Sequence, residues 1–303
     1  MTAIHESDVA VIIIGRNARD YVKQSLESLQ TAEWKRYSYE LIYVDNGSTD
    51  GTVEMLKQFP GVRTIFNEQN LGFCKAGNQA VAISRSRYYF FLNDDTIVLG
   101  DAVARLIDLL DTTEDAGVAG ARLLYPDMSE QWSGRRFPTP LNGIFGRRSL
   151  LTRMFPNAGA VRRYLFKDQI TGERPFVVDW VSAAAMMVRR ETFHRAGGLA
   201  EGYYYFHEAV FCGRVARTGW KTYLHPQSRI IHYEGKGSGS RPLGIQHWHV
   251  RDFHRGAFRF YCEHHGLHRY HPTRWGVAAI MWTRAALLLA AHSVASLKRS
   301  AVR

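Results

Sequence analysis

Two adjacent carboxylates stand directly after an apolar run in the first third of the chain. The run YYFFL (88–92) is followed by Asn93, Asp94 and Asp95. Oxygen ligands of this kind suit Mg²⁺ or Mn²⁺, which keep open positions for the phosphate oxygens of a substrate. A divalent cation held there would stabilise a diphosphate that leaves with growing negative charge. The acid pair alone has a second explanation, because the same dipeptide is a common N-cap for a following helix, expected here over 101–111.

Three further polar loops follow apolar runs, at 15–17, 45–51 and 67–72. Ordinary turn and N-cap preferences for Gly, Asn, Asp and Ser explain any one of them. Ligands of open parallel sheets, however, bind outside the carboxyl ends of the strands. Carboxylates that converge from two loops, Asp45 and Asp95, therefore favour a ligand site at one sheet edge.

The elements that position these loops alternate between strands and helices. Short β-branched or aromatic runs at 9–14, 39–44, 62–66 and 88–92 are separated by amphipathic stretches. This βαβα order predicts an α/β fold with a mostly parallel, doubly wound sheet. Its buried strands should be continuously apolar, as these runs are.

Composition is typical of an ordered globular protein, with 46% hydrophobic and 22% charged residues in 303. No linker separates independent domains, so one domain with appendages is expected. The excess of 39 basic over 28 acidic residues can serve nucleic acid, an anionic membrane or a phosphorylated substrate. No nucleic-acid motif accompanies it, so a nucleic-acid partner is not expected.

Cysteine usage and the first residues indicate the compartment. Cys74, Cys212 and Cys262 are odd in number and lack C-x-x-C spacing, which indicates neither a disulfide framework nor a zinc site. The first ten residues lack the basic and long apolar segments of a secretion signal. A cytoplasmic location is therefore expected.

The second half is less regular. The Arg-rich stretch 147–167 is expected to leave the sheet and to be mobile or to contact an acceptor. Order returns with one buried strand expected over 176–190, a helix over 206–217 and two short strands at 221–224 and 229–233.

The tail from Pro242 is expected to form two helices. The second carries about 16 mostly apolar residues interrupted by Arg284, which is short of the roughly 20 that span a bilayer. Two interpretations remain open: a helix folded back onto the domain, or a helix on the inner face of the cell membrane. In the second, residues near the interface would be Trp275, Trp282, Lys298 and Arg299.

The order of several motifs carries a resemblance. VIIIGRN, VDNGSTDGT, NLGFCKAGNQA and FFLNDDT are followed by VDWVSAAAMMVRRETFHRAGGL and YYYFHEAVFCGRVARTGWKTYLHPQSRIIHYEGKGS. From about Val9 to about Ser238 the chain resembles the family 2 inverting glycosyltransferases of the GT-A fold, particularly rhamnosyltransferase-like members. The resemblance implies a Rossmann-like, mostly parallel sheet flanked by helices, with a C-terminal helical extension. It also implies these boundaries: a GT-A domain over 1–240, comprising a nucleotide-binding part (1–120) and an acceptor part (121–240), and the extension over 241–303.

The same resemblance implies a donor site. Asp45 would hydrogen-bond the base of the nucleotide, with the backbone near Ile14 and Gly15 forming the rest of the pocket. Asp95 would be the metal ligand for Mg²⁺ or Mn²⁺, and His232 would complete the metal site. Asp94 would contact the ribose or the sugar. The remaining donor-binding residues implied are Asn17, Gly72, Asn93 and Arg214.

Inverting transfer needs a base that removes the acceptor hydroxyl proton. In the family this base is the second acid of a pair within a stretch like EDVDLCLR, and alignment on Cys212 and Arg214 places His207 and Glu208 on that pair. Glu208 is therefore the predicted catalytic base. The chain departs from the pattern at His207 and at Val210, where acids are usual. These changes leave open an altered pKa of Glu208, altered acceptor recognition, or a degenerate protein.

Two further features bear on the acceptor side. Trp180 and Ser182 fall on the strand that meets the acceptor sugar in the family. The aromatic run 203–206 could stack on a sugar, but core packing is the favoured explanation.

The leading hypothesis is transfer of rhamnose from dTDP-rhamnose to a polyprenyl-linked or other glycan acceptor. Transfer of a hexose or galactofuranose from a UDP-linked donor shares every motif, and a non-catalytic nucleotide-sugar-binding scaffold would retain the fold. A dehydrogenase is disfavoured, because no G-x-G-x-x-G follows the first strand.

Overall fold

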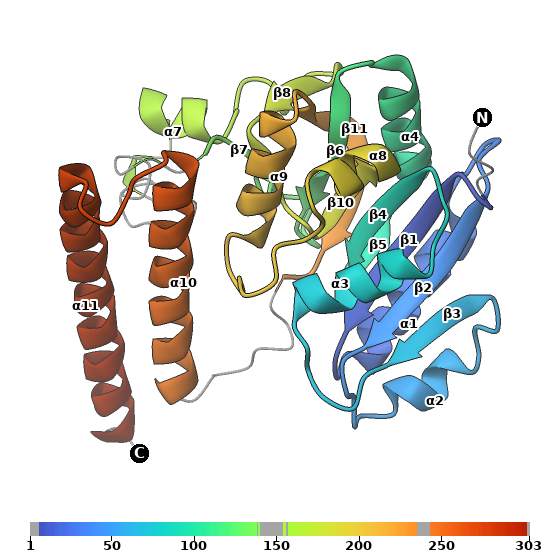
Figure 1. Ribbon diagram of the computed structural model, residues 1–303. Coiled ribbons are helices and arrows are strands. Elements are labelled where there is room, and N and C mark those ends of the chain that lie inside the picture. Colours follow the sequence, from blue (N-terminus) through green and yellow to red (C-terminus); the bar gives the residue numbers. More distant parts are fainter. Residues whose placement is uncertain (1–5, 138, 140–153, 156, 235–242, 302–303) are drawn as a thin grey trace.

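A nine-stranded sheet organises the chain, in the computed structural model that describes residues 6–137, 139, 154–155, 157–234 and 243–301 (Figure 1). The strand order is β3-β2-β1-β4-β10-β6-β11-β5, and β8 pairs with β11 off this path. Helices cover both faces, so the predicted α/β architecture is confirmed.

The first half of the sheet is parallel, and its four strands are those predicted. They are β1 (Val9–Gly15), β2 (Tyr39–Asp45), β3 (Val62–Phe66) and β4 (Tyr88–Asn93). In register, Gly15 lies opposite Asp45, and Ile14 lies opposite Asn93. The carboxyl ends of β1, β2 and β4 therefore meet at one edge, as the polar loops require.

The second half is mixed. It contains β5 (Thr96–Val98), β6 (Ala116–Leu124), β8 (Phe176–Val178), β10 (Ala185–Arg189) and β11 (Lys221–His232). β10 runs antiparallel to both β4 and β6, whereas β11 runs parallel to β6 and antiparallel to β5. His232 at the end of β11 is thereby paired with Thr96, next to the acidic loop.

Two strand predictions are wrong in detail. The segment 176–190 is not one strand, because the chain turns at Ser182, whose carbonyl accepts from Ala185 N at 3.3 Å. Its middle part, β9 (Trp180–Val181), pairs with β7 (Gly134–Arg135) outside the main sheet. The predicted strands 221–224 and 229–233 are instead parts of one strand, β11, which ends at His232 and whose register shifts between His225 and Arg229. Pro226 lies in this shift, and it has no N–H to donate to the ladder.

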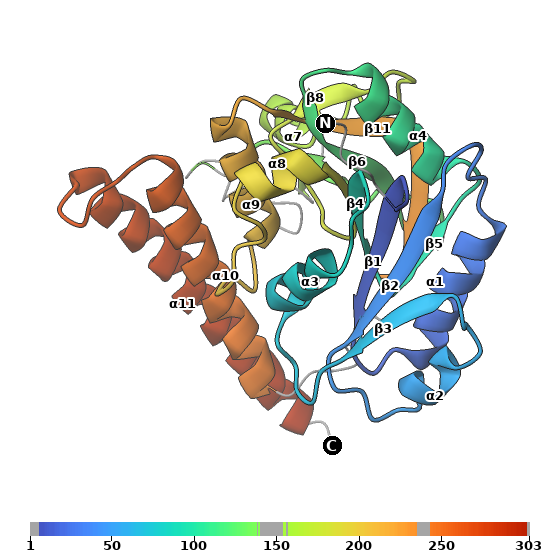
Figure 2. The same cartoon turned by 45° about the vertical axis from the view of Figure 1, so that its right-hand side comes forward.

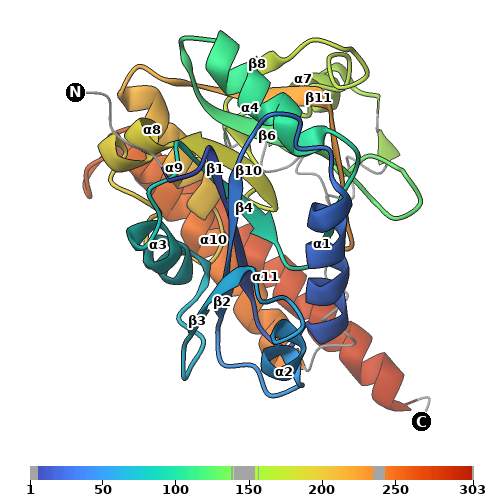
Figure 3. The ribbon, with the colours of Figure 1, turned by 90° about the vertical axis from the view of Figure 1, so that its right-hand side faces the viewer.

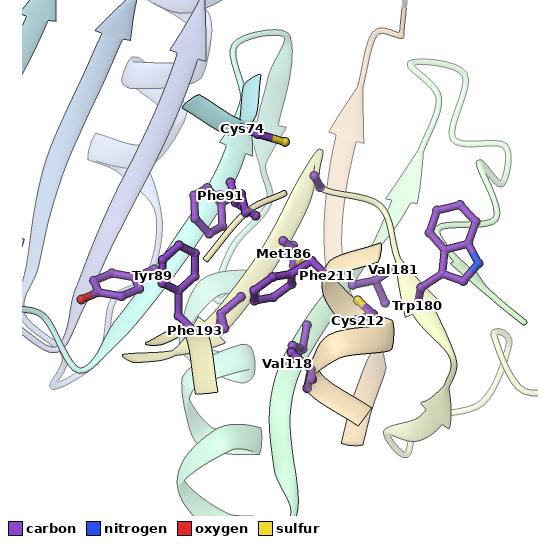
Figure 4. Close-up of a cluster of buried hydrophobic side chains, with 14 of the residues drawn as sticks. Cys74, Tyr89, Phe91, Val118, Trp180, Val181, Met186, Phe193, Phe211 and Cys212 are labelled. Atoms are coloured by element: carbon purple, nitrogen blue, oxygen red, sulfur yellow. The ribbon is translucent and has the colours of Figure 1, made fainter. Parts of the chain in front are cut away.

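Alternate residues of the parallel strands face two hydrophobic cores. One core packs beneath α1 (Arg19–Thr31), α2 (Thr52–Leu56) and α4 (Ala102–Thr112), and the other beneath α3 (Phe73–Ala82), α8 (Arg190–Arg195) and α9 (His207–Arg217). The two layers lie on opposite sides of the sheet, with α1 and α3 separated by the strands (Figure 3). The helices expected over 101–111 and 206–217 are confirmed as α4 and α9. Phe91, Met186 and Phe211 meet in the second core (Figure 4).

The tail forms a helical hairpin beside α9, made of α10 (Leu243–His264) and α11 (Pro272–Ala301) (Figures 1 and 2). The two predicted helices are therefore present. The expectation that the second is too short to span a bilayer is wrong: Pro272–Val294 is 23 residues long and, by length and composition alone, could cross a membrane. α10 joins the main core through Phe260. Of the expected excursion at 147–167, positions 147–153 and 156 lie outside the described residues, and α7 (Gly159–Tyr164) follows.

The favoured explanation of the aromatic run 203–206 agrees with its contacts. Tyr203 is buried, and Phe206 packs against α10 through Phe253 and Phe260. Only Tyr204 is largely exposed, where its ring meets Trp248 edge-on. All three cysteines are buried and free, in line with the absence of a disulfide framework.

Candidate active site

Asp45, at the end of β2, is almost fully buried and has one unpaired oxygen. Its Oδ2 accepts the backbone N–H groups of Gly47 at 3.0 Å and Ser48 at 2.8 Å. Its Oδ1 is buried, and no hydrogen-bond partner for it exists among the described residues. A buried acceptor without a donor is costly, so the site gains when a ligand N–H is supplied. This suits the expected contact between Asp45 and a nucleobase.

Asn17 holds the first two loops together. Its backbone N–H donates to Ser48 Oγ at 2.9 Å, and its Oδ1 accepts the backbone N–H of Thr49 at 2.7 Å. The residue is left-handed, with φ of 54°. Arg19 N continues the connection by donating to Asp50 Oδ2 at 3.1 Å. The side-chain oxygen of Asn17 is thus already used, and its influence on a donor would act through the shape of the loop.

A group of three amides, to which the sequence motifs assigned no role, connects the next two loops to α3. Asn67 Nδ2 donates to Asn46 Oδ1 and to Gln79 Oε1, both at 3.0 Å, and Gln79 Nε2 returns a bond to Asn67 Oδ1 at 3.1 Å. Gly72, the N-cap residue directly before α3, has φ of 79°, and a Cβ there would meet nothing within 4 Å. Gly72 is therefore placed beside open space at the same end of the sheet.

Asp94 turns towards the end of β1 rather than towards His232. Its carboxylate accepts the backbone N–H of Arg16 and lies close to Gly15 and to the buried hydroxyl of Tyr43. Burial, and secondly the charge of Asp95, raise the pKa of Asp94 to about 7. Asp94 and Asp95 are therefore adjacent in sequence but distinct in environment.

Gly15 leaves no room for a side chain. A Cβ there would overlap the Tyr43 hydroxyl and lie 2.7 Å from Asp94 Oδ2. Gly15→Ala is expected to lower the free energy of unfolding by about 1–3 kcal/mol, the usual cost of overpacking, and to weaken nucleotide-sugar binding. Thermal melts and calorimetric titration measure both effects. Gly61→Ala, where a Cβ meets nothing within 4 Å, is the control; equal behaviour of the two variants would show that Gly15 tolerates a side chain.

Asp95 and His232 form the second centre of the site. Their Oδ1 and Nε2 atoms are 3.1 Å apart, and both side chains are largely buried. Asn93 Nδ2 also approaches His232 Nε2, at 3.2 Å. The end of β4, the following turn and the end of β11 thus bring together Asn93 and Asp95, from one sequence motif, and His232, from another.

Gln131 orients His232. The Gln131 amide group donates to the His232 carbonyl oxygen, and its Oε1 lies 2.8 Å from His232 Nδ1. Since that oxygen only accepts, Nδ1 carries the ring proton and Nε2 faces Asp95 with its lone pair. Two lone-pair atoms 3.1 Å apart require a cation or a second ring proton between them.

The pair fits a divalent cation. Neighbouring ligands of an octahedral Mg²⁺ or Mn²⁺ lie about 3 Å apart, because each sits about 2.1 Å from the ion. The observed 3.1 Å separation agrees with this. Within the described ranges, no third His, Cys, Asp or Glu joins them. Asp95 and His232 would therefore hold a cation whose other positions remain for phosphate oxygens and water.

Gln131→Leu is expected to weaken Mn²⁺ binding about 10- to 100-fold, since an outer partner that orients a ligating histidine typically contributes that much. Mn²⁺ titration followed by electron paramagnetic resonance in the presence of a nucleotide diphosphate would measure the change. Ser133→Ala, which removes a similarly buried polar group without touching His232, controls for general destabilisation. Equal Mn²⁺ affinity in both variants would refute an orienting role.

Glu208 lies in the first turn of α9, beside His207. Its Oε2 is 3.6 Å from His207 Nδ1, which donates to the Tyr204 carbonyl oxygen at 3.1 Å. The His207 ring packs on Phe73 with centroids 4.9 Å apart, and Phe73 in turn lies near Phe91. Phe91 and Asn93 face the same side of β4, so Glu208 stands on the side of the sheet to which Asn93 points.

The second departure from the family pattern has a packing explanation. Val210 is buried in the core between α9 and the sheet, where an unpaired carboxylate would be costly. Arg214 is half-buried in the last turn of α9, six residues beyond Glu208. That spacing corresponds to about 9 Å along the helix axis.

The two candidate acceptor residues, Trp180 and Ser182, are buried and half-buried. Trp180 is buried, its Nε1 donates to the Arg136 carbonyl oxygen at 2.9 Å, and the Arg135 guanidinium covers its ring. Ser182 is half-buried at the turn after β9. Within the expected acceptor region, positions 138, 140–153, 156 and 235–240 lie outside the described residues.

Comparison with known sequences adds to this geometry. Residues 10–191 match the model of a family described as glycosyl transferase family 2. The N-acetylglucosaminyl-diphospho-decaprenol L-rhamnosyltransferase of Mycobacterium tuberculosis is 27% identical over 306 aligned positions, which cover 96% of this chain and 94% of that protein. The rhamnosyltransferase WbbL of Escherichia coli K12 is 25% identical, with 82% and 91% covered.

Solved structures share the fold. The mannosyltransferase PcManGT from Pyrobaculum calidifontis, solved with GDP-Man and Mn²⁺, aligns with a TM-score of 0.58 at 16% identity and covers 97% of this chain and 82% of that one. GalNAc-T7, solved with UDP, GalNAc and Mn²⁺, aligns with a TM-score of 0.59 at 15% identity and covers 82% and 47%. Both likenesses concern the arrangement of the sheet and its helices.

Proposed function

The chain belongs to glycosyl transferase family 2 and is a glycosyltransferase of the GT-A fold. We propose that it transfers rhamnose from dTDP-rhamnose to a polyprenyl-linked glycan. The extent of the match to the mycobacterial L-rhamnosyltransferase, nearly the full length of both chains, supports rhamnose as the transferred sugar and a polyprenyl-linked acceptor. The reaction would take place on the cytoplasmic side of the membrane that carries the acceptor.

The observation that carries the proposal is that two groups of buried polar atoms at one sheet edge lack a complementary partner. Among the described residues no donor reaches the buried Oδ1 of Asp45, and Asp95 Oδ1 lies 3.1 Å from the lone-pair-bearing Nε2 of His232. A nucleoside diphosphate sugar with a divalent cation would supply both partners. Its base would offer an N–H to Asp45, and the cation bound to its diphosphate would lie between Asp95 and His232.

Each residue then has a separable task. Asp45 binds the base, while the backbone of Ile14 and Gly15 lines the nucleotide pocket. Asp95 and His232 hold the cation, which when bound offsets the charge that develops on the departing diphosphate. Asp94 meets the ribose or the sugar.

Glu208 takes the proton of the acceptor hydroxyl as that oxygen attacks the anomeric carbon from the face opposite the diphosphate. His207 sets the position of Glu208 from 3.6 Å away, in place of the usual acid. The anomeric configuration inverts, as is typical of family 2.

The proposal is tested by supplying the protein with dTDP-rhamnose, Mn²⁺ and a polyprenyl diphosphate that bears N-acetylglucosamine. The expected result is a rhamnosylated lipid whose anomeric configuration, read by NMR, is opposite to that of the donor. UDP-glucose and UDP-galactofuranose serve as matched donors, and a preference for either would replace the rhamnosyl assignment. Binding of dTDP-rhamnose without transfer to any acceptor would favour a scaffold.

A further inference from the structure

The outer face of α11 is apolar and carries no charge over five turns. Between Trp275 and Val294 the only Asp, Glu, Lys or Arg is Arg284. The exposed apolar side chains of this stretch include Trp275 at 66% and Leu287 at 68% exposure, together with Ile280, Trp282 and Val294. Large exposed apolar faces of this kind mark interaction sites.

Arg284 does not interrupt this face, because it points into the hairpin. Its Nη1 donates to His254 Nε2 at 2.8 Å, and His254 is buried within α10. His254 Nδ1 donates in turn to the Val250 carbonyl oxygen at 2.7 Å, which leaves Nε2 as an acceptor for the guanidinium. The charge that breaks the apolar run in the sequence is therefore absent from the outer surface.

Basic residues predominate in the sequence of the tail. The tail from Leu243 to Arg303 contains nine Lys and Arg but only two acidic residues, Asp252 and Glu263. Arg251 and Arg255 are exposed on α10. Trp248 and Tyr204 add exposed aromatic rings in contact with each other. An apolar helix face with aromatic and basic side chains beside it complements the interface of an anionic lipid bilayer.

We propose that the outer face of α11 docks the protein onto an anionic membrane, with the helix lying in the plane of the interface. α10 packs along most of α11. At one end the Arg274 guanidinium lies over the Phe258 ring, and towards the other end Ser293 Oγ lies 3.3 Å from His247 Nε2. A spanning α11 would carry Arg251 and Arg255 into the hydrocarbon, which is strongly unfavourable. An in-plane helix buries the apolar face and leaves these arginines at the headgroups.

The inference rests on the proposed function only for the purpose of docking, because a docked hairpin would bring the active site to an acceptor that is anchored in the membrane. Binding to lipid needs neither donor nor turnover. Titration of dTDP-rhamnose on the same proteins reports on the proposed function separately, so either idea can fail alone.

The test is sedimentation of the full chain with vesicles of phosphatidylcholine, with and without phosphatidylglycerol. The wild type is expected to bind the phosphatidylglycerol vesicles and to be released by salt. The variant W275E/W282E/L287E should bind at least about tenfold more weakly, because it places three charges on the docking face. The control variant I83E/M128E/V177E alters three exposed apolar residues outside the hairpin and should bind as the wild type does.

Three results would overturn the inference. The first is a wild type that binds no phosphatidylglycerol vesicles, or a hairpin variant that binds as well as the wild type while its circular dichroism melt is unchanged. The second is light scattering that shows a wild-type dimer and a monomeric hairpin variant, which would assign the face to a second copy of the chain. The third is resistance of the bound protein to alkaline carbonate extraction, which would indicate a spanning helix.

Discussion

Replacing Glu208 with glutamine is expected to reduce the rate of sugar transfer about 10²- to 10⁴-fold, the usual contribution of a general base. The glutamine amide has nearly the shape of the carboxylate, but it cannot take up the proton of the acceptor hydroxyl. Glu208 lies in the first turn of α9 and makes no contact with Asp45, Asp95 or His232 among its described interactions. Affinity for the nucleotide sugar should therefore change by less than about twofold, so that the loss falls on kcat rather than on donor binding.

The matched control is Glu191→Gln. Glu191 is also in the first turn of a helix, α8, where it forms an exposed ion pair with Arg195. Its loss should leave transfer unchanged, because exposed pairs contribute about 0–1 kcal/mol even to stability. Transfer is measured by release of the nucleoside diphosphate, and donor binding by calorimetry. If Glu208→Gln transfers sugar as fast as Glu191→Gln, another residue is the base.

Asp95→Asn is expected to weaken Mn²⁺-dependent binding of the nucleotide sugar about 10- to 100-fold and to abolish most transfer. The substitution replaces a charged candidate ligand with a neutral one, and among the described residues it leaves His232 as the remaining candidate ligand of the pair. The fold should survive this substitution. Asp95 lies next to Asp94 in the same turn, and the charge of Asp95 helps to raise the pKa of Asp94. Removing one of two neighbouring carboxylates relieves repulsion rather than packing.

The control for this variant is Asp127→Asn, in the exposed turn after β6. Calorimetric titrations at several Mn²⁺ concentrations, together with thermal melts, separate lost ligation from unfolding. Undiminished Mn²⁺ dependence in Asp95→Asn, at a melting temperature equal to that of the wild type, would remove Asp95 from the metal site.

Much of this site was accessible from sequence because parallel strands have a simple signature. Continuous apolar runs located β1 to β4, and the residues after each run had to meet at one edge once the strands were parallel. Asp45 and Asn93 were thereby placed before any contact was known. His232 was found only through its motif, since the sheet order that brings β11 beside β5 has no local signal.

Other parts depend on distant contacts that no periodicity encodes. Gln131 acts on His232 from 101 residues away and lies in a segment without a motif. The division of 176–190 into three strands depends on the pairing of β9 with β7, although the run itself is uniformly apolar. In the sequence Arg284 interrupts the apolar run of the last helix. In the folded helix its side chain points towards His254 and away from the apolar face.

We infer that a nucleotide sugar binds through a cation at Asp95 and His232. Calorimetric titration of the wild type with dTDP-rhamnose, once with Mn²⁺ and once with a chelator, tests this inference. We predict that the wild type binds dTDP-rhamnose with Mn²⁺ and that chelation weakens this binding at least about tenfold. Asp95→Asn should bind equally weakly with Mn²⁺ present. Binding of the same strength with and without Mn²⁺, or no binding of any nucleoside diphosphate sugar, would contradict it.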